Sequence, residues 1–173
     1  PAVHVLLGEG EHLDEQGRRR TSQPAESVEL GLIEGRLGIT STNLFATEGI
    51  RRIGGWNPDL SSSQEYDLMF RLWQEGAVFQ AVTGIDTRIH ERAEGRISTS
   101  NLRQKWINHC ALQRRMLDAF DLNGMAPDVR HRILQAYFDR IRTLAVHDRK
   151  EAVRMFKACA LLKGFSPQVN ALN

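Results

Sequence analysis

The residues best suited to chemistry form an acidic segment, Gln64–Leu68, at the expected start of a helix. Three serines, Ser61–Ser63, stand directly before it, and their hydroxyl groups are expected to cap the helix. A carboxylate in the first turn of a helix faces free backbone N–H groups and the positive end of the helix dipole. Such a carboxylate stays charged and fixed in place, as a general base must be. The alternative is that Glu65 and Asp67 only stabilise the helix, because first-turn acids are common.

The residues before Ser100 are expected to alternate between strands, turns and short helices. Periodicity and β-branched content predict strands at His4–Leu7, continuing to a turn at Gln16-Gly17, and at Leu37–Phe45, Ala77–Val82 and Thr87–His90. Short helices are predicted at Ser27–Ile33, at Thr47–Arg52 with Thr47 as its cap, and at Gln64–Glu75 with Leu68, Met69, Leu72 and Trp73 on its apolar side. The polar segment Arg18–Ala25 contains Pro24 and is expected to be a loop, as is Glu91–Ser100.

From about Thr99 the pattern is purely helical, so the sequence predicts two domains, at residues 1–98 and 99–173. Helices are expected from Thr99 to Phe120, from Pro127 onward, and from Asp148 to Gly164. The residues expected to face inward are Leu102, Trp106, Cys110, Leu117 and Phe120, then Val129, Ile133, Tyr137, Ile141 and Leu144, then Val153, Phe156 and Ala160. The last two helices resemble one tetratricopeptide-type hairpin, which we interpret as packing, since a repeat array needs stacked neighbours.

The composition is that of a soluble globular protein, with 41% hydrophobic and 25% charged residues. No apolar run approaches the length of a membrane span. Cys110 and Cys159 both have apolar neighbours in helical patterns, which predicts small core residues rather than a disulfide. A reducing, cytoplasmic location fits this cysteine usage. The chain begins without Met or a signal layout, and we expect it to come from the interior of a longer chain.

The net charge is only +2, but basic residues outnumber acidic ones from Asn101 onward. A basic helical surface suits anionic lipid headgroups or another acidic partner. The alternative is an ordinary solvated helix face. Nucleic acid is not expected as a partner, because no binding motif accompanies the charge.

The order of features from Gly38 to Ser100 resembles the acceptor-side half of a family 2 glycosyltransferase with the GT-A fold. Gly54–Asp59 is similar to the family's Gly-Gly-Phe/Trp turn, and Gln64–Leu68 stands in the place of its Glu-Asp-x-Asp-Leu box. Thr87–His90 is similar to its Tyr-Arg-x-His strand. Upstream, His12–Gly17 is similar to the hairpin that often follows the metal-binding strand. The resemblance implies a partial GT-A α/β domain with a mixed sheet, followed by an all-α extension.

What the resemblance implies for activity is inverting transfer of a sugar from a nucleotide-sugar donor to a glycan or glycoconjugate acceptor, in cell-surface polysaccharide assembly. Glu65 stands where the family's catalytic Asp would be, so it is implied as the general base. The nucleotide-binding half and its Asp-x-Asp motif are not found in this sequence, and we expect them before Pro1. The divalent metal, Mn or Mg, would find its main ligands there. By itself, the chain is expected to be inactive.

Other site residues are implied less specifically. Candidate substrate contacts are Trp56, Gln64, Asp67, Thr42, Asn43 and Arg88, and the candidate metal or diphosphate ligand is His90. Each also has a structural alternative: Trp56 as a core anchor, Arg88 as a solvated cation, His90 as a structural strand residue. Asp67 points to a different side of the helix from Glu65 and is expected to bond backbone or a basic neighbour.

Two other functions remain open at this stage. One is a non-catalytic helical interaction module that carries a transferase remnant. The other is a hydrolase that uses Glu65 with Asp67. The hydrolase is disfavoured, because glycosidases need two carboxyl groups on opposite sides of the scissile bond.

Overall fold

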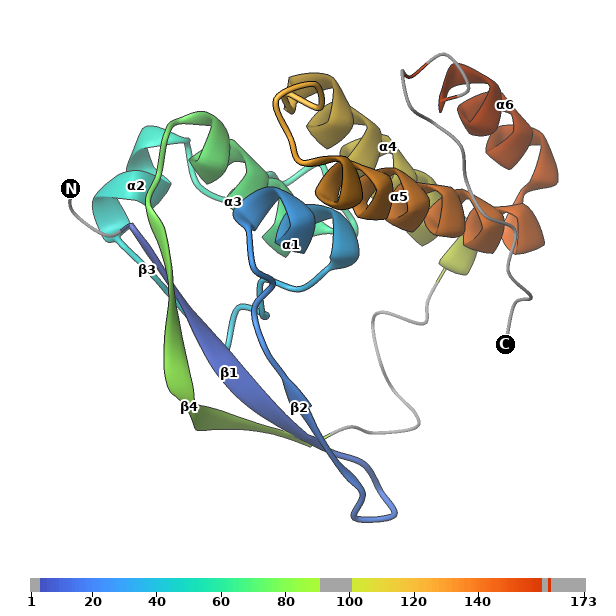
Figure 1. Cartoon of the computed structure of the whole chain (residues 1–173). Coiled ribbons are helices and arrows are strands. Elements are labelled where there is room, and N and C mark those ends of the chain that lie inside the picture. The colour runs from blue at the N-terminus through green and yellow to red at the C-terminus, as the bar shows by residue number, and fades with distance from the viewer. Residues whose placement is uncertain (1–3, 91–100, 160–161, 163–173) are drawn as a thin grey trace. The chain divides into compact units, whose positions relative to one another are not determined.

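A computed structural model of the chain describes residues 4–90, 101–159 and 162. The chain divides into two compact units, Pro1–Ser100 and Asn101–Asn173, close to the boundary predicted at 98 and 99. The first unit combines a sheet with helices, and the second is helical, so the fold is mixed α/β (Figure 1). The segment Glu91–Ser100, predicted as a loop, lies outside the described residues.

The first unit is built around strand β1 (Val5–Leu13), which pairs with the other three strands of a four-stranded sheet. Strand β4 (Phe79–His90) runs parallel to β1 along its whole length. Strand β3 (Asn43–Phe45) pairs antiparallel with the start of β1, and β2 (Arg19–Ser22) pairs antiparallel with its end. A strand has only two edges, and β4 pairs with one edge of β1 along its length. The strands β2 and β3 therefore both pair with the other edge. The sheet is mixed, as predicted.

Strand β2 corrects the prediction that Arg18–Ala25 forms a loop. The predicted turn does exist: the Asp14 carboxylate accepts hydrogen bonds from the backbone N–H groups of Gln16, at 3.0 Å, and Arg18, at 2.8 Å. This turn reverses the chain and places Arg19–Ser22 beside β1. A polar segment becomes a strand here because backbone pairing across the hairpin, rather than its own composition, stabilises it.

The prediction of a buried strand over Leu37–Phe45 was wrong for most of its length. Only Asn43–Phe45 is a strand, and Leu44 within it is 70% exposed. The preceding residues form a folded loop, the 37–43 loop, because their side chains bond locally to the backbone. The Asn43 amide donates to the Leu37 carbonyl at 2.7 Å, and the Thr42 hydroxyl accepts from the Ile39 N–H at 3.0 Å. Such local bonds compete with strand pairing.

Three helices of the first unit, α1 (Val28–Glu34), α2 (Thr47–Arg52) and α3 (Gln64–Gln74), gather at the end of the sheet where β1 begins (Figure 1). Their apolar faces and the start of β1 make the core. Its buried members include Val5, Leu7, Leu30, Leu32, Ile33, Leu37, Leu68, Met69, Phe70 and Leu72. The helix predictions are confirmed, and so is the inward face of α3 at Leu68, Met69 and Leu72.

The predicted caps of α2 and α3 were wrong. Ser63 precedes α3 with φ of 61°, in the left-handed region, and its side chain makes no capping hydrogen bond. An N-cap hydroxyl needs an extended backbone to reach the first-turn N–H groups, as Ser27 does before α1. Thr47 is the first helical residue of α2 instead of its cap, and Ala46 precedes it.

Residues 77–90 were expected to hold two strands, but they hold a single one, β4. Its pairing with β1 shifts register near Glu9 and then continues to His90. Gly84, with φ of 117°, lies within this stretch. A glycine accepts the irregular backbone that lets one long strand pass a register shift without ending.

The second unit consists of α4 (Leu102–Ala119), α5 (Pro127–His147) and α6 (Arg149–Cys159). Pro127 is the first residue of α5, and the Asp148 carboxylate accepts from the Glu151 N–H at 3.0 Å at the start of α6, both as predicted. The described residues of α6 end before Gly164, so the predicted end of this helix is not described.

The inward face of α4 and α5 is largely as predicted, and that of α6 is not. Cys110, Leu117, Phe120, Ile133, Tyr137, Ile141 and Leu144 are buried. Leu102, Val153 and Phe156 were expected inside but are 38%, 46% and 39% exposed, and Ala160 is not described. Helix α6 instead buries Ala152, Met155 and Cys159. Both faces of α6 carry apolar residues, so periodicity alone chose the wrong one.

Cys110 and Cys159 are buried free thiols, as predicted. Burial raises the pKa of the Cys110 thiol to about 12. Nearby on α4, the Trp106 ring meets the edge of the His109 ring at 5.8 Å and lies under Lys105 and Arg140. Burial, and then the positive charges of Arg140 and Lys105, lower the pKa of His109 to about 4.

Candidate functional site

Glu65 lies in the first turn of α3, and its carboxylate reaches the 37–43 loop. Its Oε1 atom accepts a hydrogen bond from the Thr40 hydroxyl at 2.6 Å and another from the Thr40 N–H at 3.3 Å. Within the part of the chain that the structure describes, the other oxygen, Oε2, has no hydrogen-bond partner. The side chain is half-buried. The carboxylate is therefore held through one oxygen and can accept a proton from a ligand through the other.

A tyrosine next to Glu65 fixes the 37–43 loop against the same helix. The Tyr66 hydroxyl accepts from the Leu37 N–H at 3.2 Å and lies 3.3 Å from the Gly38 carbonyl, to which it donates. The Asn43 amide nitrogen also lies 3.8 Å from the Met69 sulfur, in the second turn of α3. The loop that holds Glu65 is thus tied to α3 at three further points, which orients Thr40 toward the carboxylate.

Asp67 takes a structural place, as expected of an acid that points away from Glu65. It is fully buried, and its Oδ2 accepts from Arg71 Nε at 2.8 Å. Arg71 in turn donates from Nη1 to the Ile53 carbonyl at the end of α2, at 2.9 Å. Asp67 therefore links α3 to α2 through Arg71, and this confirms the predicted basic neighbour.

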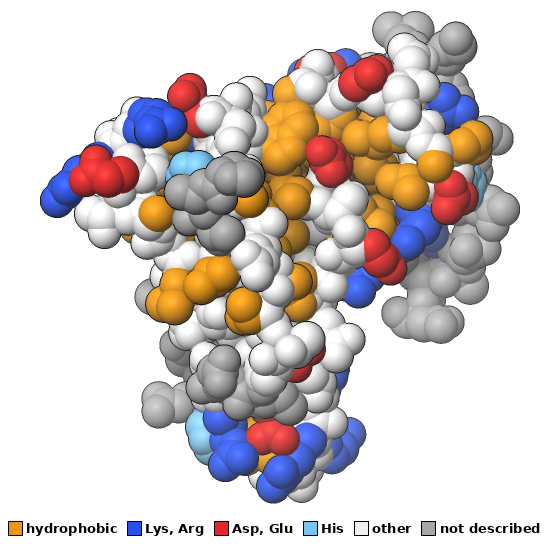
Figure 2. Space-filling view, turned by 60° about the vertical axis from the view of Figure 1, so that its left-hand side comes forward, with side chains coloured by type: hydrophobic (Ala, Val, Ile, Leu, Met, Phe, Trp, Pro, Cys, Tyr) orange, Lys and Arg blue, Asp and Glu red, His pale blue; other side chains and the backbone are white. Residues whose placement is uncertain are grey.

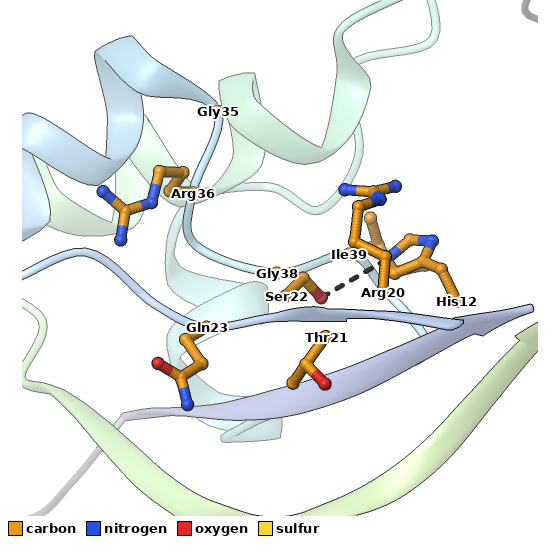
Figure 3. A pocket seen from close by; sticks show the side chains of 9 residues that line it. All are labelled: His12, Arg20, Thr21, Ser22, Gln23, Gly35, Arg36, Gly38 and Ile39. Carbon is orange, nitrogen blue, oxygen red and sulfur yellow. Dashed lines mark hydrogen bonds between the residues drawn. The ribbon is translucent and has the colours of Figure 1, made fainter. Parts of the chain in front are cut away.

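A hollow of about 590 Å³ opens beside the 37–43 loop, between that loop and the β1–β2 hairpin (Figure 3). We call it the hairpin hollow; it is lined by His12, Arg20–Gln23, Gly35, Arg36, Gly38 and Ile39. Ile39 directly precedes Thr40, the residue that binds Glu65. The His12 ring nitrogen Nε2 lies 3.3 Å from the Ser22 hydroxyl, across the hairpin. The candidate base and the hollow therefore share one loop.

The structure brings some of the predicted site residues together and leaves others apart. Thr42 and Asn43 belong to the 37–43 loop, where their polar groups hold the loop itself. Gln64 lies beside Glu65 and is exposed, with its amide donating to the Leu60 carbonyl at 2.6 Å. Trp56 is 43% exposed, which contradicts its alternative role as a core anchor.

Arg88 lies on β4 and pairs with Glu11 of β1 at 2.8 Å. Glu11 also pairs with Arg19 at 3.3 Å. The Arg88 hydrogen bond is the largest cause that lowers the pKa of the Glu11 carboxyl, followed by the charge of Arg19. Arg88 is therefore engaged by a carboxylate on the sheet, and its role as a substrate contact stays a prediction.

His90 ends β4, where it is exposed and faces Leu13 in the register of the sheet. Among the described residues, no group of three or more His, Cys, Asp or Glu side chains could hold a metal ion. His90 as a metal or diphosphate ligand therefore stays a prediction, and no step considered below depends on a metal.

Several residues of the site were missed by the sequence reasoning, namely Thr40, Tyr66, His12, Arg20 and Arg36. Thr40 was missed because Leu37–Phe45 was predicted to be a buried strand. The run Gly38–Thr42 contains glycine, serine and threonine, which favour loops and local side-chain bonds, and this signal pointed to the correct structure. No comparable signal marks the others, because the hollow exists only once the hairpin has formed.

Comparisons with models of protein families, with curated proteins and with solved structures find no match to this chain. The resemblance to family 2 glycosyltransferases therefore stays a prediction that rests on the residues themselves. None of the described helices combines the length and the apolar character needed to cross a membrane.

Proposed function

We propose that this chain supplies the acceptor side of an inverting glycosyltransferase and that Glu65 is its general base. The observation that carries the proposal is the Glu65 carboxylate, held through Oε1 by Thr40, whose neighbour in sequence, Ile39, lines the hairpin hollow. The order of motifs from Gly38 to His90 supports the same activity by resemblance. The donor would be a nucleotide-sugar, which favours a cytoplasmic reaction, and the acceptor a glycan or glycoconjugate.

In the proposed reaction, an acceptor hydroxyl attacks the anomeric carbon of the donor sugar. The proton of that hydroxyl passes to Oε2 of Glu65, while the bond from the anomeric carbon to the diphosphate oxygen breaks. Thr40 acts as a positioning residue, because two hydrogen bonds to Oε1 restrict rotation of the carboxylate. The base must lie within hydrogen-bond reach of the acceptor hydroxyl, which the bond from Thr40 leaves possible through Oε2.

The test is Glu65→Gln in the full-length protein, assayed by release of nucleoside diphosphate from UDP-, GDP- and dTDP-sugars with candidate acceptors. Gln keeps an oxygen for Thr40 but cannot take a proton, so kcat is expected to fall by about 10²- to 10⁴-fold, the usual range for a general base. Glu48→Gln is the matched control, since Glu48 is an exposed acid in the first turn of α2. Unchanged kcat in Glu65→Gln would remove the base assignment.

A second candidate, a helical module that binds an anionic membrane surface, is favoured by one side of α6. Val153 and Phe156 are exposed there, and Arg149, Lys150 and Lys157 stand three or four residues from Val153. Residues at this spacing share one side of a helix. Glu151 and Arg154 pair with each other, at 2.8 Å through Arg154 Nε. An exposed apolar pair flanked by cations is typical of helices that lie on lipid headgroups.

The membrane candidate is tested by sedimentation of the chain with phosphatidylcholine vesicles, with and without phosphatidylglycerol. Binding is expected only with the anionic lipid, and each cation near the surface contributes about 1 kcal/mol. Val153→Ser with Phe156→Ser should weaken binding, whereas Val146→Ser, on exposed Val146 of α5, should not. Binding that is absent, or insensitive to salt, would refute this candidate.

A further inference from the structure

The hairpin hollow is lined by positively charged and hydrogen-bonding side chains. Arg20, Arg36 and His12 line it together with Ser22 and Gln23, and none of its described lining residues is an acid. Carboxylates outside the lining reach some of these side chains: Glu34 pairs with Arg36 at 3.0 Å, and Glu9 accepts from the Gln23 amide at 3.2 Å. The lining therefore offers the guanidinium groups of Arg20 and Arg36 as donors to a negatively charged ligand.

Two neighbouring arginines of the β1–β2 hairpin lie on opposite faces of it. On β2, Arg19 pairs with Glu11, and Glu11 also takes Arg88. Side chains alternate between the faces of a strand, so Arg20 lies on the opposite face from Arg19, with His12 as its register partner. Arg19 and Glu11 therefore lie on one face of the hairpin, and Arg20 and His12 line the hollow from the other.

The shape of the hollow suits an extended ligand. In the close view, the guanidinium groups of Arg36 and Arg20 stand at opposite ends of the lining, with Gly38 and Ser22 between them (Figure 3). Its volume of about 590 Å³ lies within the usual range of small-molecule sites. Basic side chains also gather at the far end of the sheet, where β1 turns into β2 and where Arg18–Arg20 are exposed (Figure 2).

We propose that the hairpin hollow binds the carboxylate or phosphate groups of an anionic acceptor glycan. Arg20 and Arg36 would each present a planar fork of N–H donors to one oxyanion, a geometry that carboxylates and phosphates share. Ser22 and His12 would bind sugar hydroxyls or a further oxygen between them. This inference rests on the proposed function, because it is the link through Ile39 and Thr40 to Glu65 that makes the bound molecule the acceptor.

The experiment is titration of the full 173-residue chain, followed by NMR at the backbone amides of Gly35, Gly38 and Ile39. The probes are tetragalacturonate, mannose 6-phosphate and, as the neutral control of similar length, maltotetraose. Shifts at these amides are expected with one or both acidic probes and not with maltotetraose. The acidic probe that binds with the lower Kd identifies the preferred group as carboxylate or phosphate.

Two variants and a control connect the binding to the hollow. Arg20→Gln and Arg36→Gln should each raise the Kd of the acidic probe by roughly tenfold, the loss expected for one charge-assisted contact. Arg52→Gln, which removes an exposed charge from α2 in the same unit, should not change it. Equal binding of maltotetraose, or full binding by both variants, would overturn the proposal. Binding is measured without a donor, so its failure leaves the Glu65 assay standing, and the reverse also holds.

Discussion

Glu65 and Asp67, the two acids in the first turn of α3, are expected to have different roles. Asp67 should be needed for the stability of the first unit. The perturbation is Asp67→Asn, which keeps the size of the side chain and removes its charge. Asp67 is fully buried and holds Arg71, whose side chain is only 21% exposed and also bonds to Ile53 at the end of α2. The substitution therefore leaves the Arg71 guanidinium half-buried beside a neutral group.

The magnitude follows from that burial. Removing one partner of a buried ion pair costs about 3–5 kcal/mol, because the remaining charge is uncompensated. Arg71 retains some contact with water, so we expect the lower end, about 3 kcal/mol, for the loss in the free energy of unfolding. A domain is stable by only about 5–15 kcal/mol, so the variant should fold but unfold at much lower denaturant.

The assay is urea unfolding followed by tryptophan fluorescence in a Trp106→Phe background. The remaining tryptophans, Trp56 and Trp73, both belong to the first unit, so the signal reports that unit alone. Trp73 is well placed for this purpose, because its ring stacks near Phe70 on α3 and its N–H donates to Glu29 of α1. Loss of the α3 packing should therefore change its emission.

Two comparisons decide whether the reasoning holds. Glu48→Gln breaks an exposed ion pair with Arg51, whose side chains are 79% and 70% exposed, and should cost less than about 1 kcal/mol. The double variant Asp67→Leu with Arg71→Met removes both charges and should be less destabilised than Asp67→Asn. If Asp67→Asn costs no more than Glu48→Gln, the buried ion pair does not stabilise the first unit and the argument fails.

The remaining predictions concern both units. Burial lowers the pKa of His109 to about 4, so as pH falls the imidazole is protonated in the unfolded chain before it is protonated in the folded one. The free energy of unfolding should therefore drop by about 3 kcal/mol between pH 6.5 and 4. His109→Leu should remove that part of the pH dependence measured by urea unfolding. Gly38→Ala should destabilise more than Gly54→Ala: both have φ near 76°, but only the Gly38 Cβ would lie 2.5 Å from the Thr42 hydroxyl, and equal losses in thermal unfolding would contradict this. Cys110 should react with a thiol reagent only as fast as the helical unit unfolds, and rapid modification of the native protein would show that it is accessible.

The elements that could be predicted from the sequence are those whose signals are local. The 3.6-residue apolar period predicted α3, α4 and α5, and Pro127 and Asp148 marked the starts of two helices through their backbone chemistry. The separation of Glu65 from Asp67 also followed from the helix, because residues two apart face different sides. The change from mixed to helical pattern predicted the division into two units.

The features that could not be predicted depend on contacts between distant parts of the chain. Strand β2 exists because the hairpin pairs it with β1, and the buried face of α6 depends on which side meets its neighbours. Thr40 contacts Glu65 across twenty-five positions of sequence, in a loop that Tyr66 also bonds to α3. The spacing of residues along the chain does not predict such a contact, because the free energy that forms it comes from packing rather than from local propensity. The sequence thus indicated Glu65 as a candidate base, and the fold supplied the loop that holds its carboxylate and that also lines the hairpin hollow.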